Sequence, residues 1–169
     1  MMYTEEDILS LLEGRNIWFH VDRHEAVFDM DALSSVKLAY PDAEAKNLFL
    51  RDDRKENYCL FVVMGEWRVN LKAVRKMLGL RPLSFASEDE LLAVLGLTKG
   101  SVTPFGLLND ASHRTVCFID ENFLSGNGLI GVHPNDNRAT VVLRTADLVG
   151  ILQSAGIDVR VVSFRGIEV

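Results

Sequence analysis

Three short stretches hold the residues of this 169-residue chain that could do chemistry. The first is Gly100-Ser-Val-Thr-Pro-Phe-Gly106, in which two glycines and one proline fix an unusual backbone path. Such a loop exposes backbone N–H groups and lets another molecule approach the main chain closely. The loop has no obvious nucleophile, acid or metal ligand. If it works at a site, it works through its backbone, by binding and polarising a ligand.

The other two stretches are a lysine and a second loop. Lys46 lies between an alanine-rich turn and the apolar strand pattern of residues 47–51. A lysine in this position either extends its ammonium group to water or serves a site. Gly131-Val-His-Pro-Asn135 places glycine, histidine and proline at a strand end, which is typical of an ordinary turn or of a binding loop. The spacing alone leaves both questions open.

Other familiar site motifs match in residue type and spacing but lack the structural context that each motif needs. Gly126-Asn-Gly-Leu-Ile-Gly131 has the G-x-G-x-x-G spacing, but a strand pattern follows where a dinucleotide site needs a helix. In residues 96–101 a lysine precedes the glycine that it should follow in a phosphate-binding loop. His20 and His24 are four residues apart, yet they lack the pattern of a zinc site. We therefore expect no cofactor and no metal, while a catalytic triad assembled in space stays open.

Composition predicts one ordinary globular domain over residues 1–169, with 48% apolar and 25% charged residues. The N-terminus is acidic and helix-like, unlike a signal peptide, and no apolar run approaches the roughly 20 residues that cross a membrane. Cys59 and Cys117 lie in apolar strand patterns, as expected for small buried thiols in a reducing cytosol. These features predict a cytoplasmic protein with no membrane partner.

The charge is unevenly distributed along the chain. A net charge of −6 argues against a protein that coats DNA, so we expect no DNA partner. The segment from Trp67 to Arg81, here called the basic segment, nevertheless contains five basic residues and no acid. They are Arg68, Lys72, Arg75, Lys76 and Arg81. The basic segment is either a solvated helix face or a surface for an anionic partner.

Helices and strands must position these residues. Capping patterns predict helices that begin at Thr4, Asn70, Ser87 and Thr145, and a short helix is expected around residues 31–36. Strands are predicted over residues 17–21, 47–51, 58–64, 67–69, 115–120, 129–132, 139–144 and 159–164. The second and third of these should form an antiparallel hairpin. The order predicts an α/β (α+β) domain with a mixed, largely antiparallel sheet and flanking helices.

These pieces, in this order, resemble one family. The segments AKNLFL, VVMGEWRVNLKAVRKMLG, LTKGSVTPFGLLND, VCFIDENFL and GVHPN look like the YbaK/ProX family of free-standing aminoacyl-tRNA deacylases. That family is related to the editing domain inserted in bacterial prolyl-tRNA synthetases. The resemblance covers about Thr4 to Phe164, and it is strongest to the ProX (PrdX, ProXp-ala) branch, which clears alanine from tRNA(Pro).

The resemblance implies a role for each stretch. It makes Lys46, Gly100 and Gly131 the catalytic positions. It makes Asn47, Thr103, Pro104, Phe105, His133, Pro134 and Asn135 the substrate-binding positions. Backbone N–H groups near the two glycines would stabilise the oxyanion of ester hydrolysis, each by roughly 3 kcal/mol. The Lys46 ammonium would bind negative charge rather than act as a base. In this family a ribose hydroxyl of the substrate assists, which accounts for the missing nucleophile.

The implied partner is the acceptor end of tRNA(Pro) carrying alanine, with prolyl-tRNA synthetase as a second candidate. A proline pocket rejects the smaller alanine weakly, because a few methylenes are worth only about 1–3 kcal/mol. We expect Phe19, Val21, Phe28 and Met30 to line the second, smaller pocket, and the basic segment to contact tRNA. Two alternatives stay open. The chain could be a Cys-tRNA(Pro) deacylase, or a non-catalytic module that binds aminoacyl-tRNA or an amino acid.

Overall fold

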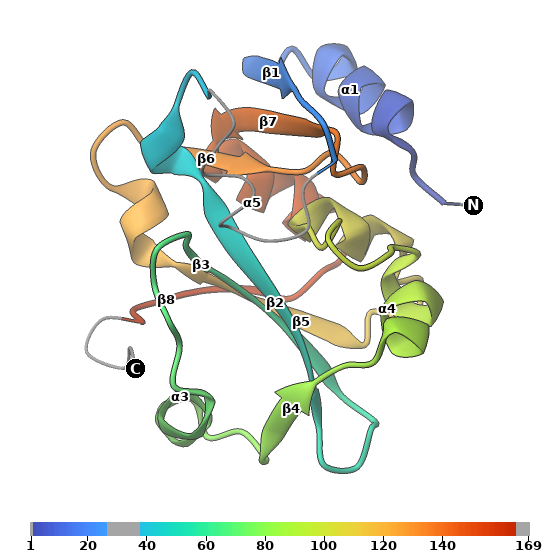
Figure 1. The fold of residues 1–169 in the computed structure, drawn as a ribbon, viewed down its shortest axis with the longest axis vertical. Helices are drawn as coiled ribbons and strands as arrows, with labels where there is room; N and C mark the ends of the chain where they lie inside the picture. Colours follow the sequence, from blue (N-terminus) through green and yellow to red (C-terminus); the bar gives the residue numbers. More distant parts are fainter. Residues whose placement is uncertain (1, 27–37, 165–169) are drawn as a thin grey trace.

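The computed structural model describes residues 2–26 and 38–164, which form two β-sheets with helices around them (Figure 1). The three-stranded antiparallel sheet has the order β1 (Phe19–Arg23), β7 (Ala139–Arg144) and β6 (Leu129–Val132). The five-stranded sheet has the order β4 (Leu83–Phe85), β2 (Ala45–Asp52), β3 (Tyr58–Met64), β5 (Thr115–Asp120) and β8 (Val159–Val162). Its β3–β5 and β5–β8 pairs are parallel and the others antiparallel, so the predicted mixed α/β fold is confirmed, with two sheets.

The helices begin where short polar side chains cap them. The α-helices are α1 (Glu5–Gly14), α3 (Leu71–Leu78), α4 (Glu88–Leu95) and α5 (Thr145–Ser154). The 3-10 helices are η1 (Pro41–Ala43), η2 (Pro104–Asn109) and η3 (Glu121–Leu124). Thr4 and Ser87 form the expected capping boxes, and Asn70 accepts a hydrogen bond from the backbone N–H of Ala73. Gly79 then ends α3 with a φ of +68°, a conformation that glycine adopts without steric cost.

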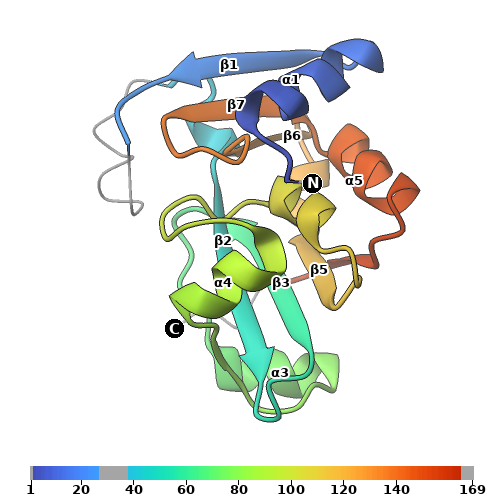
Figure 2. The same ribbon diagram turned by 90° about the vertical axis from the view of Figure 1, so that its right-hand side faces the viewer.

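Both faces of the five-stranded sheet are buried. Along β3, Tyr58, Leu60 and Val62 belong to the main core, which also takes in α1, α4, α5, η2 and the three-stranded sheet. The alternate residues Cys59, Phe61 and Val63 belong to a second core with Val74 of α3. In Figure 2 the three-stranded sheet lies at the top and α3 at the bottom, and β2 runs between them. The continuous apolar pattern of residues 58–64 follows from this burial on both faces.

Some expectations need correction. Residues 67–69 form no strand, because the chain leaves the turn at Gly65 and runs directly to the cap of α3. Thr145 is the first residue of α5 and not its cap, since its hydroxyl donates to the Phe123 carbonyl at 2.7 Å. The short helix expected around residues 31–36 lies outside the described residues. Within those residues, no helix is long and apolar enough to cross a membrane.

The two cysteines are free and buried, as the sequence predicts. Burial raises the pKa of the Cys59 thiol to about 12, and burial also raises the pKa of Cys117. Both thiols therefore stay protonated near neutral pH, and they pack as apolar side chains in the two cores.

Candidate functional site

The two sheets meet where β2 begins and β6 ends (Figure 1). Glu44, immediately before β2, forms an isolated parallel bridge with Gly131 of β6. The carbonyl of Glu44 also accepts a hydrogen bond from the N–H of Gly65, in the turn that follows β3. We call residues 44–47 together with residues 131–133 the sheet junction. It brings the Lys46 stretch and the Gly131 loop to the same end of the molecule.

The Gly100 loop docks on the sheet junction through one side chain. The Thr103 hydroxyl donates a hydrogen bond of 2.6 Å to the carbonyl of His133. Thr103 also caps η2, which begins at Pro104, and Gly100 has a φ of +88° that favours glycine. Phe105 is fully buried in the main core and so anchors the loop to it. The G-x-x-x-P and G-x-H-P stretches are therefore in direct contact.

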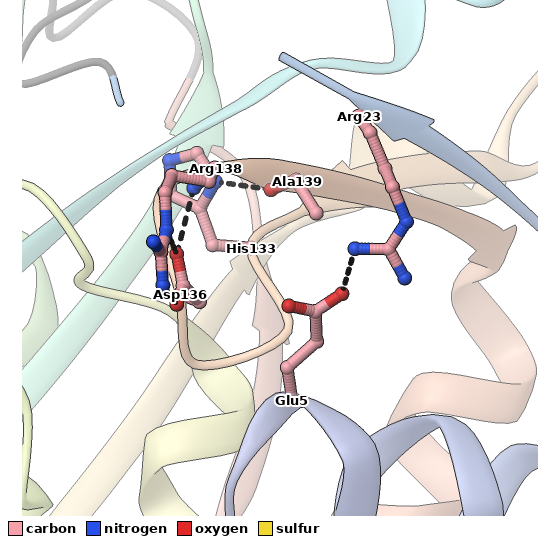
Figure 3. A network of polar contacts seen from close by, with 6 residues as sticks. All are labelled: Glu5, Arg23, His133, Asp136, Arg138 and Ala139. Atoms are coloured by element: carbon pink, nitrogen blue, oxygen red, sulfur yellow. Dashed lines mark hydrogen bonds and ion pairs between the residues drawn. The ribbon is translucent and has the colours of Figure 1, made fainter. Parts of the chain in front are cut away.

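His133 is held in one orientation by the loop that follows it. Its Nδ1 lies 2.8 Å from the carbonyl of Ala139, so Nδ1 carries the proton and Nε2 is left as an acceptor (Figure 3). Burial lowers the pKa of the imidazole, although the hydrogen bond to Ala139 opposes this effect. The ring also packs edge-on against His24, with 6.2 Å between the ring centroids. The imidazole is therefore neutral near pH 7, and among the described residues no hydrogen bond engages its Nε2.

The turn between β6 and β7 is fixed at both sides. Asn135 has a φ of +62°, and its Nδ2 donates to the carbonyl of Tyr3 at 2.9 Å. Its Oδ1 is buried without a hydrogen-bond partner. Asp136 and Arg138 form an ion pair at 2.8 Å within the turn, beside His133 (Figure 3). Pro134 is buried, and the contacts of Asn135, Asp136 and Arg138 hold the turn in place.

Lys46 and Asn47 point to opposite faces of β2, because side chains alternate along a strand. The Lys46 ammonium donates to the carbonyl of Trp67, close to Arg68. Burial lowers the pKa of Lys46, and the charge of Arg68 lowers it further. The Asn47 Oδ1 is buried without a partner. In the described part of the chain, no hydrogen bond or ion pair joins Lys46 to Thr103 or His133, so the structure does not link the Lys46 ammonium to that contact.

Glu44 is the residue of the sheet junction that sequence reasoning missed. It is only 8% exposed, and its Oε1 has no hydrogen-bond partner among residues 2–26 and 38–164. A Cβ on Gly131 would lie 2.6 Å from that oxygen, so the carboxyl group rests on the bare glycine. Burial, together with the charge of Asp22, raises the pKa of Glu44 to about 7. The only signal in the sequence was an acid two residues before Lys46, in a stretch that looked like an alanine-rich turn.

The expected small pocket can be placed only in part. Phe19 and Val21 of β1 are half-buried and pack against the main core. Phe28 and Met30 lie outside the described residues. Within the described residues, no cluster of three histidine, cysteine or acidic side chains could hold a metal ion. The sheet junction therefore offers a lysine, a neutral imidazole, a carboxyl group and glycine backbone as its chemical groups.

The basic segment divides into paired and unpaired residues. Arg81 forms two hydrogen bonds with the carboxylate of Asp53, at 2.6 and 2.9 Å, and Arg75 donates to the carbonyl of Leu80. Arg68, Lys72 and Lys76 are exposed and have no ion pair within residues 2–26 and 38–164. Arg68 is close to Lys46, whereas Lys72 and Lys76 lie on α3, at the bottom of Figure 1.

Comparison with known proteins assigns the chain to a family. Residues 24–151 match the family described as "Aminoacyl-tRNA editing domain". The prolyl-tRNA editing protein ProX of Acetoanaerobium sticklandii is 37% identical over 155 residues, which cover 92% of this chain and 94% of that protein. The prolyl-tRNA synthetase associated domain-containing protein 1 of Mus musculus is 32% identical over 148 residues, covering 85% of this chain and 86% of its own.

A solved structure has the same fold. The crystal structure of a proposed trans-editing enzyme for prolyl tRNA synthetase aligns with a TM-score of 0.64 at 20% identity, covering 94% of this chain and 96% of its own. At that identity the alignment supports the fold alone. The family match and the sequence identity carry the assignment: this chain belongs to the aminoacyl-tRNA editing domain family, and it is an aminoacyl-tRNA deacylase, a hydrolase of carboxylic esters.

Proposed function

We propose that this chain is a trans-editing enzyme that hydrolyses mischarged tRNA(Pro), with alanine as the amino acid removed. The observation that carries the proposal is the hydrogen bond from Thr103 to the His133 carbonyl, which joins the two loops at the sheet junction. The names of the relatives, an editing protein for prolyl-tRNA and a protein associated with prolyl-tRNA synthetase, support the choice of tRNA. The reaction would take place in the cytoplasm, where charged tRNA is found.

The sheet junction suits hydrolysis without a protein nucleophile. A water oxygen attacks the ester carbonyl, the C–O bond to the ribose breaks, and the ribose oxygen leaves with a proton. Backbone N–H groups of the Gly100 loop or near Gly131 would stabilise the oxyanion. The acceptor Nε2 of His133 would hold a ribose hydroxyl, and the Lys46 ammonium would offset negative charge after turning away from the Trp67 carbonyl.

The test is a deacylation panel. Purified protein is incubated with alanyl, cysteinyl, seryl and prolyl forms of tRNA(Pro), and release of each amino acid is measured. We expect alanine to be released fastest and proline to be retained. Faster release of cysteine would reassign the substrate to the cysteine branch. Tight binding of charged tRNA without release of any amino acid would support a non-catalytic module and overturn the proposal.

The unpaired cations of the basic segment are the proposed contact for the tRNA backbone. A cation that neutralises a phosphate makes binding depend on salt, because condensed counterions are released. Lys76→Glu should therefore raise KM, leave kcat nearly unchanged and reduce the salt dependence of KM. Arg15→Glu is the matched control, because Arg15 is exposed at the end of α1, outside the basic segment, and forms no ion pair with the described residues. Equal effects of the two variants would argue against a local contact.

A further inference from the structure

Glu44 presents a polar group that the fold leaves unsatisfied. Its Oε1 is shielded from water and accepts no hydrogen bond from the described residues. A buried acceptor without a partner is unfavourable, and such groups in folded proteins call for an explanation. The carboxyl group lies against Gly131, and the methyl group of Thr140 is 3.5 Å from the place that a Gly131 side chain would take. A larger residue at position 131 would therefore fill the space beside the carboxyl oxygen.

The charged groups around Glu44 do not supply the missing partner. Asp22 of β1 is near enough to raise the Glu44 pKa, and its own oxygens accept from the backbone N–H of Ala39 and contact the imidazole of His20. The ammonium of Lys46 is engaged by the Trp67 carbonyl. Asp22 thus adds negative charge near Glu44, its own side-chain contact is with His20, and no ion pair to Glu44 is formed among the described residues. A small cationic group with N–H donors fits these surroundings.

We propose that Glu44 is a specificity-determining residue whose carboxylate binds the α-ammonium group of the aminoacyl ester, against Gly131. This inference rests on the proposed function, because it assigns the part of the substrate that distinguishes an amino acid from other acyl groups. An α-amino group has an ordinary pKa of about 8 and is largely protonated at neutral pH. Its hydrogen bond to a carboxylate is charge-assisted, which makes it stronger than a neutral one. Since Gly131 covers the oxygen in the free chain, binding requires this contact to open slightly.

The assignment has a consequence for selectivity. An ester whose α-nitrogen is acylated carries no charge and offers one donor at most, so the enzyme should spare N-acylated and peptidyl esters. An ester of the corresponding hydroxy acid would lack the cation as well. Discrimination against these esters should reach roughly 10- to 100-fold, the size expected when a hydrogen bond to a charged group is lost.

The test compares alanyl-tRNA(Pro) with lactyl-tRNA(Pro), in which a hydroxyl replaces the α-ammonium group. The wild-type chain should prefer the alanyl ester by roughly 10- to 100-fold in kcat/KM. Glu44→Gln should lose most of this preference by slowing the alanyl ester, while the rate on the lactyl ester changes little. Glu56→Gln is the control, because Glu56 is exposed in the β2–β3 turn. Equal wild-type rates on the two esters, or equal slowing of both by Glu44→Gln, would overturn the assignment.

A binding measurement separates this inference from the proposed function. Adenosine carrying alanine through a 3′-amide cannot be hydrolysed as an ester, and the lactyl amide is its uncharged match. Calorimetric titration should show tighter binding of the alanyl amide to the wild-type chain and no preference in Glu44→Gln. If the wild-type chain hydrolyses no ester but keeps this preference, the proposed function fails and the Glu44 contact stands. Equal affinity for the two amides in the wild-type chain would reject the contact, even if Glu44→Gln cannot be purified folded.

Discussion

The two ends of the β2–β3 hairpin differ in how fully their polar groups are paired. At the end near Asp52 there is a cavity of about 280 Å³ lined by Arg81, Arg114 and Arg160, among other residues. Arg81 is paired with Asp53 and Arg160 with Asp158, and the Arg114 guanidinium lies 4.9 Å from the centroid of the Tyr58 ring. At the other end lies the sheet junction. Three buried oxygens in or next to it lack a hydrogen-bond partner among the described residues: Glu44 Oε1, Asn47 Oδ1 and Asn135 Oδ1. The Asp52 end has two such atoms, Thr115 Oγ1 and Arg51 Nε, and the latter is ion-paired with Glu90.

The difference shows that a cavity is not by itself a functional site. The arginine-lined cavity has room, but each of its arginines already interacts with an acid or an aromatic ring. The sheet junction contains groups whose burial is unfavourable until something supplies a donor. A ligand gains more from such groups than from a cavity whose polar atoms are already satisfied. We therefore propose the sheet junction as the functional site, and the following predictions test that contrast.

The largest effect is expected for Lys46→Ala. Loss of the ammonium should reduce kcat/KM for alanyl-tRNA(Pro) by about 100- to 1000-fold, as when a group that stabilises the oxyanion is removed. Arg160→Ala removes a cation from the arginine-lined cavity and should leave kcat/KM nearly unchanged. Initial rates of alanine release measure both variants, and thermal melts confirm that they are folded. Comparable losses of kcat/KM in the two variants would show that the sheet junction and the arginine-lined cavity do not differ in function.

The next effect concerns Glu44 and pH. Burial, with a smaller contribution from Asp22, raises the pKa of this carboxyl group from 4.5 to about 7 in the folded chain. Between these values the folded chain keeps a proton that the unfolded chain has released. The contribution of Glu44 to the free energy of unfolding should thus be complete below pH 4.5 and fall by up to about 3 kcal/mol as pH rises to 7.

Glu44→Gln removes the titrating group while keeping its shape. Urea unfolding of both proteins between pH 4.5 and pH 8 should show the wild-type chain losing stability relative to the variant as pH rises. Asp22 and His20 are present in both proteins, so the comparison isolates the removal of the Glu44 carboxyl group. Parallel curves would mean that Glu44 titrates normally and is not confined.

A smaller effect is expected for Gly131→Ala. The added Cβ would lie 2.6 Å from Glu44 Oε1, so the sheet junction must shift, at a cost of about 1–3 kcal/mol in stability. Gly150→Ala is the matched control, because Gly150 lies in α5 with nothing within 4 Å of an added Cβ. That control should be neutral or slightly stabilising. In the double variant Gly131→Ala, Glu44→Ala the melting temperature should recover, and failure to recover would place the strain elsewhere.

The smallest effect is expected for Arg81→Gln. Arg81 and Asp53 form an exposed ion pair, and such pairs contribute little to stability. The melting temperature and KM should both remain close to those of the wild-type chain, unlike KM for Lys76→Glu. Thermal melts and KM at two salt concentrations measure the comparison. A marked rise in KM would show that the paired arginine also contacts tRNA.

The sequence predicts those parts of the fold that depend on nearby residues. The caps at Thr4, Asn70 and Ser87 and the β2–β3 hairpin follow from local hydrogen bonds and alternation, and the structure confirms them. Thr145 was misassigned because its hydroxyl finds a distant partner, the Phe123 carbonyl. The 3-10 helices were not predicted, since they are short and carry no periodic pattern.

The candidate site was predicted less completely, for the same physical reason. The family resemblance drew attention to Lys46, Gly131 and His133, but it could not show that Thr103 bonds to the His133 carbonyl. Glu44 went unnoticed because its burial arises from a bridge to Gly131, far away in the sequence. A carboxyl group acquires an unusual pKa from its surroundings and not from its neighbours along the chain.

The bridge between Glu44 and Gly131 also bears on the order of folding. It joins residues 87 positions apart, whereas the β2–β3 hairpin pairs residues of one continuous segment. Contacts between distant residues close large loops. The entropy cost of closing the loop comes before the stability that the contact adds. Deacylation activity should therefore return later during refolding than the circular dichroism signal of the strands and helices. Simultaneous recovery of the two signals would show that the bridge forms together with the hairpin.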